Sequence, residues 1–121
     1  MTDRIAVLVV DDEVLVRLDV ADQLRDVGYE VLEASNADQA IEILNITPGI
    51  RLLFTDIDMP GSMDGLKLAA AVRDRWPPVK IIVTSGHRNV DIAEIPDGSM
   101  FVSKPYAHLA VLRSMRELLS A

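Results

Sequence analysis

Residues 5–13 read Ile-Ala-Val-Leu-Val-Val-Asp-Asp-Glu, an apolar run that stops abruptly at three acidic residues. A run this short, apolar throughout and rich in β-branched side chains, predicts a strand over Ile5–Val10 that is buried on both faces. From Val14 to Leu24, apolar side chains recur at helical spacing until Gly28, which predicts a helix that stops at this glycine. The segment is therefore one strand–helix unit of an α/β fold.

The same alternation of strand and helix continues to the end of the chain. Further strands are expected at residues 29–34, 51–55, 79–83 and 100–103, and further helices at residues 37–44, 66–76 and 109–119. A weak helical segment at residues 90–95 is stopped by Pro96 and Gly98. The pattern favours a single doubly wound α/β domain, with a five-stranded parallel sheet and about five helices, the fourth of them shortened.

The composition excludes several classes of function. A length of 121 residues suits one domain spanning residues 1–121. A net charge of −7 argues against a nucleic-acid partner, because contact with a phosphate backbone requires clustered Lys and Arg. The absence of cysteine excludes disulfides and thiolate metal ligands. The first apolar run is too short to span a bilayer and no signal peptide precedes it, so we expect a cytoplasmic protein with protein partners and no membrane contact.

Polar side chains stand where four of the apolar runs end. They are Asp11 and Asp12 after the first run, Asp56 after the third, Thr84 after the fourth and Lys104 after the fifth. The carboxyl ends of parallel strands meet at one edge of the sheet, where open α/β sheets bind ligands. Three carboxylates placed together there repel one another unless a cation lies between them. We expect Mg²⁺, because it prefers carboxylate oxygens and commonly bridges protein to phosphate.

The other two side chains suit a phosphoryl group. Lys104 supplies a point charge for one phosphoryl oxygen, and the Thr84 hydroxyl can donate a hydrogen bond to another. Phosphoryl transfer mainly requires alignment and neutralised charge, which a metal, a lysine and a hydroxyl provide together. Asp56 is then the expected nucleophile, and its product is an acyl phosphate.

Each of these residues also has a simpler interpretation. Paired aspartates after a strand often only cap a helix, and a lone Lys104 or Thr84 is usually an ordinary loop residue. Their joint placement favours function. His87 and His108 lack the spacing of metal ligands, so we assign them no role.

Together these residues resemble the receiver domain of two-component response regulators, and the resemblance covers the whole chain. The segments that carry it are Val9-Val10-Asp11-Asp12-Glu13, Thr55-Asp56-Ile57-Asp58-Met59-Pro60, Met63-Asp64-Gly65, Ile82-Val83-Thr84-Ser85-Gly86 and Phe101-Val102-Ser103-Lys104-Pro105-Tyr106. The resemblance implies a flavodoxin-like sheet with strand order 2-1-3-4-5. It also implies a phosphoprotein of a phosphorelay, which takes its phosphoryl group from a histidine kinase or a histidine phosphotransferase. Signalling would follow through altered contacts with a downstream protein, and a homodimer is possible.

The resemblance assigns a role to each candidate residue of the metal site. Asp12 and Asp56 would be direct Mg²⁺ ligands together with the backbone carbonyl of Asp58, and Asp11 would act mostly through water. Asp56 would be the phosphoacceptor. The chain would not be an enzyme that acts on other substrates, because it would catalyse only its own phosphorylation and dephosphorylation.

The resemblance also covers the phosphoryl side of the site. Thr84, Ser85 and Lys104 would bind or sense the phosphoryl group, and Phe101 falls on the position of the family's switch aromatic. The bond from Lys104 to Pro105 would be a cis peptide, a form seldom seen except before proline.

The sequence departs from the family pattern in three places. One extra residue lies between Asp56 and Gly65, which predicts an altered loop shape with unchanged chemistry. The segment between Thr84 and Lys104 is short, and it contains the weak helical segment. Phe101 has no hydroxyl to bond with Thr84, so any switch must rely on ring packing.

Two further sets of residues have implied roles. Asp58 and Gly86 occupy positions where receivers tune the lifetime of the phosphoryl group. An apolar patch of Pro105, Tyr106, Leu15 and Leu18 would suit docking of the phosphodonor, although burial in the core is an equal alternative.

Three other classes of protein remain as alternatives. The Asp56-Ile57-Asp58 segment also resembles the nucleophile motif of haloacid-dehalogenase-type phosphatases, but there the motif ends the first strand. A pseudo-receiver would keep the fold without phosphorylation, and the complete acidic set argues against it. A flavodoxin relative would need a phosphate-binding loop rich in Ser, Thr and Gly after the first strand, and this sequence has none there.

Overall fold

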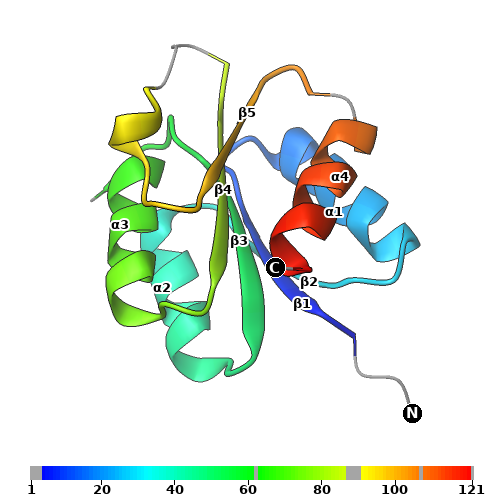
Figure 1. Ribbon diagram of the computed structural model, residues 1–121, viewed down its shortest axis with the longest axis horizontal. Helices are drawn as coiled ribbons and strands as arrows, with labels where there is room; N and C mark the ends of the chain where they lie inside the picture. The colour runs from blue at the N-terminus through cyan, green and yellow to red at the C-terminus, as the bar shows by residue number, and fades with distance from the viewer. Residues whose placement is uncertain (1–3, 62, 87–90, 107, 121) are drawn as a thin grey trace.

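The computed structural model describes residues 4–61, 63–86, 91–106 and 108–120, without the side chains of residues 92 and 108. Strands and helices alternate along the chain (Figure 1). The strands are β1 (Ala6–Val10), β2 (Glu30–Ala34), β3 (Ile50–Asp56), β4 (Lys80–Ser85) and β5 (Met100–Ser103); the helices are α1 (Val14–Asp26), α2 (Ala37–Ile46), α3 (Gly65–Arg75) and α4 (His108–Leu119). Over the described part of the chain, no helix is long and apolar enough to cross a membrane.

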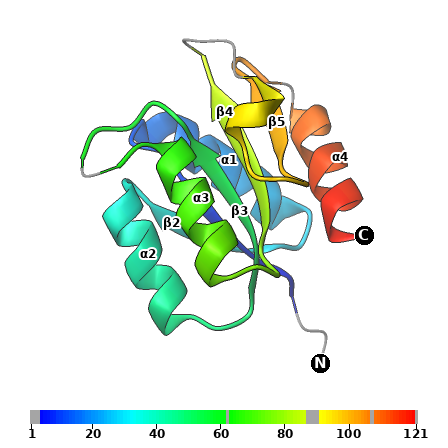
Figure 2. The same ribbon diagram turned by 60° about the vertical axis from the view of Figure 1, so that its left-hand side comes forward.

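The five strands form one parallel sheet with the order β2-β1-β3-β4-β5, as expected. The central strands β1, β3 and β4 run side by side with all their carboxyl ends at the same edge of the sheet (Figure 2). Their registers pair Val10 with Thr55 and Asp56 with Thr84. The ends of three strands therefore bring polar residues from distant parts of the sequence to one place.

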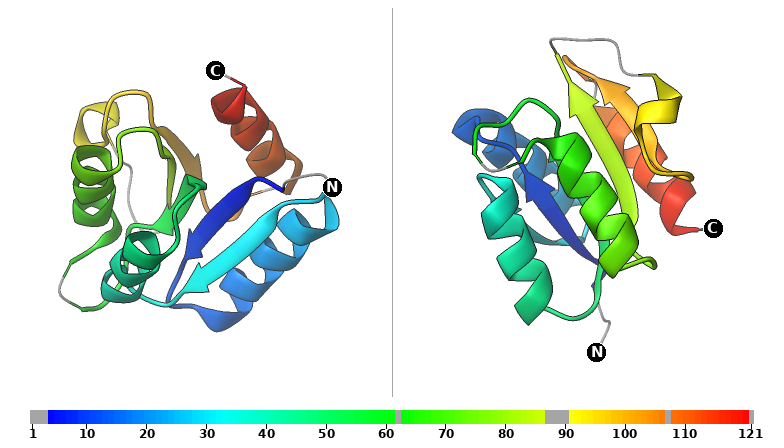
Figure 3. Two further views of the ribbon diagram at one scale, coloured as in Figure 1. Left: turned by 90° about the horizontal axis from the view of Figure 1, so that it is seen from below. Right: turned by 90° about the vertical axis from the view of Figure 1, so that its left-hand side faces the viewer.

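Two apolar layers enclose the sheet. Helices α1 and α4 cover one face, and α2 and α3 cover the other (Figures 1 and 3). Side chains alternate between the two layers along each strand: Leu8 and Leu53 pack toward α2 and α3, whereas Val7 and Phe54 pack toward α1 and α4. Burial on both faces explains why the central strand β1 is apolar at every position.

The helix ends follow from local side-chain chemistry. Asn36 caps α2 by accepting a hydrogen bond from the Gln39 amide at 2.9 Å, and the Gln39 side chain in turn accepts a hydrogen bond from the Ser35 amide. Asp64 caps α3 in the same way through the Lys67 amide. Gly28 adopts a positive φ of 101° after α1, a conformation that favours glycine.

The expectation of about five helices with a short fourth needs a correction. In the described residues between β4 and β5, the only helical segment is a 3₁₀ turn, Ile92–Glu94, so four α-helices and one short turn surround the sheet. Pro96 and Gly98 follow the turn, and neither favours a continued helix. Part of the predicted segment, Val90, lies outside the described residues.

Two strand ends were also predicted too early. The strands expected at residues 79–83 and 51–55 extend further: Thr84 and Ser85 are the last two residues of β4, and Asp56 is the last residue of β3. Both strands are longer because Asp56 pairs with Thr84 across the sheet. These polar residues are therefore held by the sheet and not by loops.

Candidate functional site

The predicted site residues gather at the carboxyl edge of the sheet. Asp11 follows β1, Asp56 ends β3, Thr84 lies in β4 and Lys104 follows β5. Asp11, Asp56 and Thr84 are almost completely buried, although polar side chains of this kind usually face solvent. Their burial implies that partners within the site, or a ligand, must satisfy them.

Three carboxylates form the acidic part of the site. One oxygen each of Asp11, Asp12 and Asp56 lies within 4.8 Å of the others, and Asp12 is exposed while the other two are buried. Burial, together with the charge of Asp11, raises the pKa of Asp56 from 3.8 to about 6, and burial also raises the pKa of Asp11. The negative charge here is incompletely neutralised, and an all-oxygen donor set of this kind suits a hard divalent cation.

Lys104 is the positive group of the site. Its Nζ lies 3.2 Å from Asp11 Oδ2, 3.5 Å from Asp56 Oδ2 and 3.7 Å from Glu13 Oε1. Burial lowers the pKa of Lys104, but the charges of Asp11 and Asp56 outweigh it, so that the pKa is raised and the ammonium stays charged. One ammonium faces several carboxylates, which leaves the cluster with an excess of negative charge. The Lys104–Pro105 peptide bond is cis.

Three polar groups flank Asp56, two on β4 and one in the loop after β3. The Thr84 hydroxyl is buried and has no hydrogen-bond partner among the described residues. The Ser85 hydroxyl donates to Asp58 Oδ2 at 2.5 Å, and the Asp58 amide lies 3.4 Å from Asp56 Oδ1. An unpartnered buried hydroxyl is costly, so Thr84 is a donor available for a ligand with an oxygen acceptor.

The backbone of Asp56 is packed against the start of α3. A Cβ on Gly65 would lie 2.0 Å from the Asp56 carbonyl oxygen and 2.7 Å from the Ile57 Cα, so no other residue fits without displacing the backbone. The Gly65 amide also donates to the Ile57 carbonyl at 2.9 Å. Glycine here lets the start of α3 lie directly against the end of β3 that carries Asp56.

An open pocket of about 620 Å³ adjoins the site between α1 and the segment after β5. Leu15 and Val16 line one side, and Lys104, Pro105 and Tyr106 line the other. Leu15 is 82% exposed, whereas Tyr106 is half-buried with its ring edge-on to Phe54. The predicted apolar patch therefore divides into an exposed part on α1 and a partly buried part at Tyr106.

Phe101 lies away from this pocket. It is half-buried and packs against the apolar layer under α2 and α3. Of the two histidines given no role, His87 and the side chain of His108 lie outside the described residues.

Sequence reasoning missed three residues that the fold places at or beside the site. Glu13 contributes a carboxylate near Lys104, Arg17 binds the Asp11 carbonyl, and Gly65 supports Asp56. Glu13 and Gly65 belong to the quoted motifs, but only the backbone contacts explain why Gly65 is needed. Arg17 left no signal in the sequence, because its partners Asp11 and Glu33 come together only when α1 packs on the sheet.

The chain is similar to known proteins over most of its length. The profile of the response regulator receiver domain matches residues 7–116. A putative NtrX-like response regulator of Rickettsia felis is 34% identical over 107 residues, which cover 85% of this chain and 22% of that protein. The nitrogen assimilation regulatory protein NtrX of Azorhizobium caulinodans is 38% identical over 83% of this chain and 23% of that protein. The chain thus spans about a quarter or less of the length of these curated relatives.

A solved structure matches the chain from end to end. The response regulator receiver protein of Sinorhizobium medicae superposes with a TM-score of 0.90 at 30% identity, covering 98% of this chain and 97% of that one. The likeness therefore extends over nearly the whole of both chains.

Proposed function

The chain belongs to the response regulator receiver domain family, and on this premise we propose that its Asp56 accepts a phosphoryl group from a phosphohistidine donor in a Mg²⁺-dependent reaction. The observation that carries the proposal is the position of Asp56. Its buried carboxylate has acidic neighbours that suit a metal and lies 3.5 Å from the ammonium of Lys104. We propose that residues 1–121 act as one receiver domain, which catalyses only its own phosphorylation and dephosphorylation.

The acidic residues fit the ion that receivers use. Asp12 and Asp56 would be direct ligands together with the Asp58 carbonyl, and Asp11 would act through water. The raised pKa of Asp56 supports this assignment, because a bound divalent cation would relieve the repulsion from Asp11. When bound, Mg²⁺ supplies positive charge to the phosphoryl oxygens as charge develops on them.

The residues of this chain would divide the remaining work. A carboxylate oxygen of Asp56 attacks phosphorus, a new O–P bond forms, and the N–P bond of the phosphohistidine breaks with its electron pair returning to the imidazole. Lys104 would turn from the carboxylates toward a phosphoryl oxygen. The Thr84 hydroxyl, which has no partner among the described residues, would donate a hydrogen bond to a second phosphoryl oxygen. The neighbouring Ser85 would respond to phosphorylation through its hydrogen bond to Asp58.

Readout of the phosphoryl group would depend on packing. Phe101 has no hydroxyl and cannot form a hydrogen bond with Thr84. A movement of Thr84 would therefore change the position of Phe101 only through the packing of side chains. We propose that the downstream protein reads this rearrangement near β5.

The open pocket beside the site suits the phosphodonor. Leu15 and Leu18 expose apolar surface on α1, and Pro105 adds to it across the pocket from Leu15. We propose that a histidine kinase or histidine phosphotransferase docks here, because a partner on this surface would bring its phosphohistidine to Asp56.

Intact-mass spectrometry tests the proposal directly. The wild type and the Asp56→Asn variant are incubated with a small phosphodonor, with and without Mg²⁺. We expect one added phosphoryl group on the wild type, only with Mg²⁺, and none on the variant. A wild type that stays unmodified, also with phosphohistidine donors, would favour the pseudo-receiver. Sustained hydrolysis of many phosphate esters would favour the phosphatase.

A further inference from the structure

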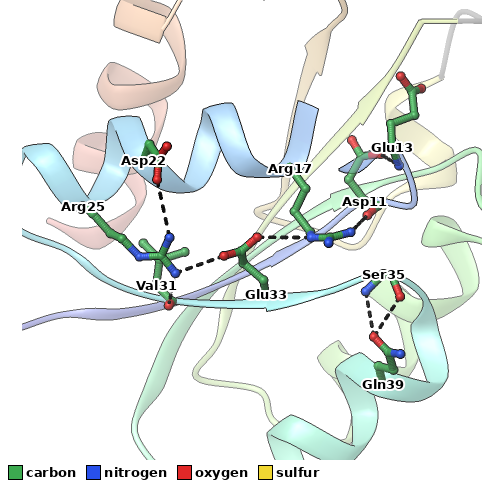
Figure 4. A network of polar contacts seen from close by, with 9 residues as sticks. All are labelled: Asp11, Glu13, Arg17, Asp22, Arg25, Val31, Glu33, Ser35 and Gln39. Carbon is green, nitrogen blue, oxygen red and sulfur yellow. Dashed lines mark hydrogen bonds and ion pairs between the residues drawn. The ribbon is translucent and has the colours of Figure 1, made fainter. Parts of the chain in front are cut away.

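Arg17 on α1 makes an unusual contact with the acidic site. Its Nη1 donates to the backbone carbonyl of Asp11 at 2.8 Å, and its side chain is only 15% exposed (Figure 4). Among the described residues, its ion pair is with Glu33, and the Asp11 carboxylate is paired with Lys104 instead. Arg17 therefore acts on the backbone that carries the acidic residues and not on their charge.

The contact completes the fixation of Asp11. The Asp11 amide donates to the Ala34 carbonyl at 3.1 Å, Oδ1 accepts from the Glu13 amide at 2.9 Å, and Oδ2 faces Lys104. Only the carbonyl is then left, and Arg17 binds it. This carbonyl and the Asp12 amide belong to one planar peptide group. By binding the carbonyl, the Arg17 guanidinium therefore also fixes the orientation of the Asp12 backbone amide.

Arg17 is itself held in place by a second layer. Its Nε lies 3.2 Å from Glu33 Oε1, and the other oxygen of Glu33 accepts from Arg25 at 3.1 Å. Arg25 also donates to the Val31 carbonyl, so the chain of contacts ends on the β2 backbone (Figure 4). A guanidinium can serve Glu33 and Asp11 at once because its nitrogens form a rigid fork, which the single ammonium of a lysine cannot imitate.

The start of α1 depends on this arrangement more than the starts of α2 and α3 do. Asn36 and Asp64 cap α2 and α3 with their side chains, whereas Glu13 at the start of α1 makes no side-chain cap. No acidic residue lies in the first turn of α1 either. The segment from Asp11 to Glu13 thus lacks the usual cap and is anchored through Arg17.

We propose that Arg17 is a positioning residue for Mg²⁺: by holding the peptide between Asp11 and Asp12 it presents the exposed Asp12 carboxylate to the ion. The proposal rests on the proposed function, in which Asp12 is a direct ligand. Loss of a partner that orients a metal ligand typically lowers metal affinity 10- to 100-fold. Arg17→Ala should therefore weaken Mg²⁺ binding by at least about tenfold.

Mg²⁺ titrations of the 121-residue chain, followed by amide chemical shifts in NMR spectra, provide the test. Arg25→Ala is the matched control, because it removes the other guanidinium on Glu33 without touching Asp11. We expect Arg25→Ala to bind Mg²⁺ within about twofold of wild type, Arg17→Lys to bind more weakly, and Arg17→Ala the most weakly. In the metal-free spectra, only the Arg17 variants should shift the Asp12 amide strongly.

The outcomes separate this inference from the proposed function. Equal Mg²⁺ affinity of Arg17→Ala and wild type would overturn the positioning role and leave the proposed function standing. Equal losses in Arg17→Ala and Arg25→Ala would also overturn it, because the effect would then be general destabilisation. A wild type without Mg²⁺ binding would overturn both. If Arg17→Ala does not fold, Arg17→Lys and Glu33→Gln carry the test, each with an expected loss.

Discussion

The site has two halves that differ in how they are built. The acceptor half consists of Asp11, Asp12 and Asp56 with the supporting Gly65. The readout half consists of Thr84 and Phe101 with the 3₁₀ turn Ile92–Glu94. In the acceptor half, the polar groups of Asp11 are all partnered and the Asp56 backbone touches α3 without a gap. In the readout half, the Thr84 hydroxyl has no partner among the described residues, and a single helical turn replaces a longer helix.

Under the proposed function, the difference follows from what each half must do. A phosphoacceptor needs its reacting oxygen, metal ligands and lysine at fixed positions, because alignment and charge supply most of the rate of phosphoryl transfer. A readout needs two arrangements of similar free energy, and a buried hydroxyl without a partner among the described residues can gain one in the second arrangement. Accordingly, the backbone of the acceptor half is closely packed, whereas the readout half contains a hydroxyl without a hydrogen-bond partner among the described residues.

The largest expected effect is that of a methyl group on Gly65. Gly65→Ala places Cβ against the Asp56 carbonyl, and we expect a loss of about 3 kcal/mol or more in the free energy of unfolding, measured by urea denaturation. Gly86→Ala is the matched change just after β4, two residues from Thr84, where the nearest atom to a Cβ is Lys104 Cβ at 3.3 Å. Its loss should stay below about 1 kcal/mol. Similar losses of unfolding free energy in both variants would contradict the close packing of Gly65 against Asp56.

The second effect is a stabilisation that depends on pH. Asp56 has a pKa of about 6 in the folded protein against 3.8 in the reference state, so its ionisation destabilises the fold as pH rises through this window. Without metal, Asp56→Asn should be more stable than wild type by roughly 2–3 kcal/mol at pH 8, and the difference should shrink toward zero near pH 4. Urea denaturation in a chelating buffer between pH 4 and 8 measures it. A difference that does not change with pH would contradict the raised pKa.

The third comparison uses two buried threonines. The Thr55 hydroxyl donates to the Asp56 carbonyl at 3.0 Å, whereas the Thr84 hydroxyl has no described partner. Thr55→Val should therefore lose about 1 kcal/mol of stability, and Thr84→Val should lose nothing or become slightly more stable. Thr84→Val should nevertheless accept phosphate more slowly. An equal loss of stability in the two variants would show that Thr84 is hydrogen-bonded in the resting protein.

The smallest expected effect concerns Trp76. It lies beyond the carboxyl end of α3, where Arg75 stacks over its ring at 4.6 Å, and it lines a pocket at the opposite end of the sheet from Asp56. Addition of Mg²⁺ should leave its fluorescence unchanged. A strong quench would mean that the site communicates with the far end of the molecule.

Sequence patterns predicted the strands and helices because periodicity and burial act locally. The β5 strand was predicted to the residue, and the long helices to within a few residues. The end of β4 was missed because Thr84 and Ser85 are small and polar, and only pairing with β3 and β5 makes them strand residues.

The candidate site was predictable to a similar extent. Asp11, Asp56, Thr84 and Lys104 were found because each ends an apolar run, and the sheet topology brings such ends together. The role of Arg17 was not predictable, since its partners Asp11 and Glu33 are set by how α1 packs over β1 and β2. Contacts that depend on the packing of whole elements leave no local pattern.

The most direct measurement of the central claim locates the phosphoryl group on the chain. After reaction with a small phosphodonor and Mg²⁺, borohydride reduces the acyl phosphate to an alcohol, and peptide mass spectrometry identifies the altered residue. The account predicts modification at Asp56 alone. Modification at Asp11, Asp12 or Asp58, or at a histidine in place of Asp56, would contradict it.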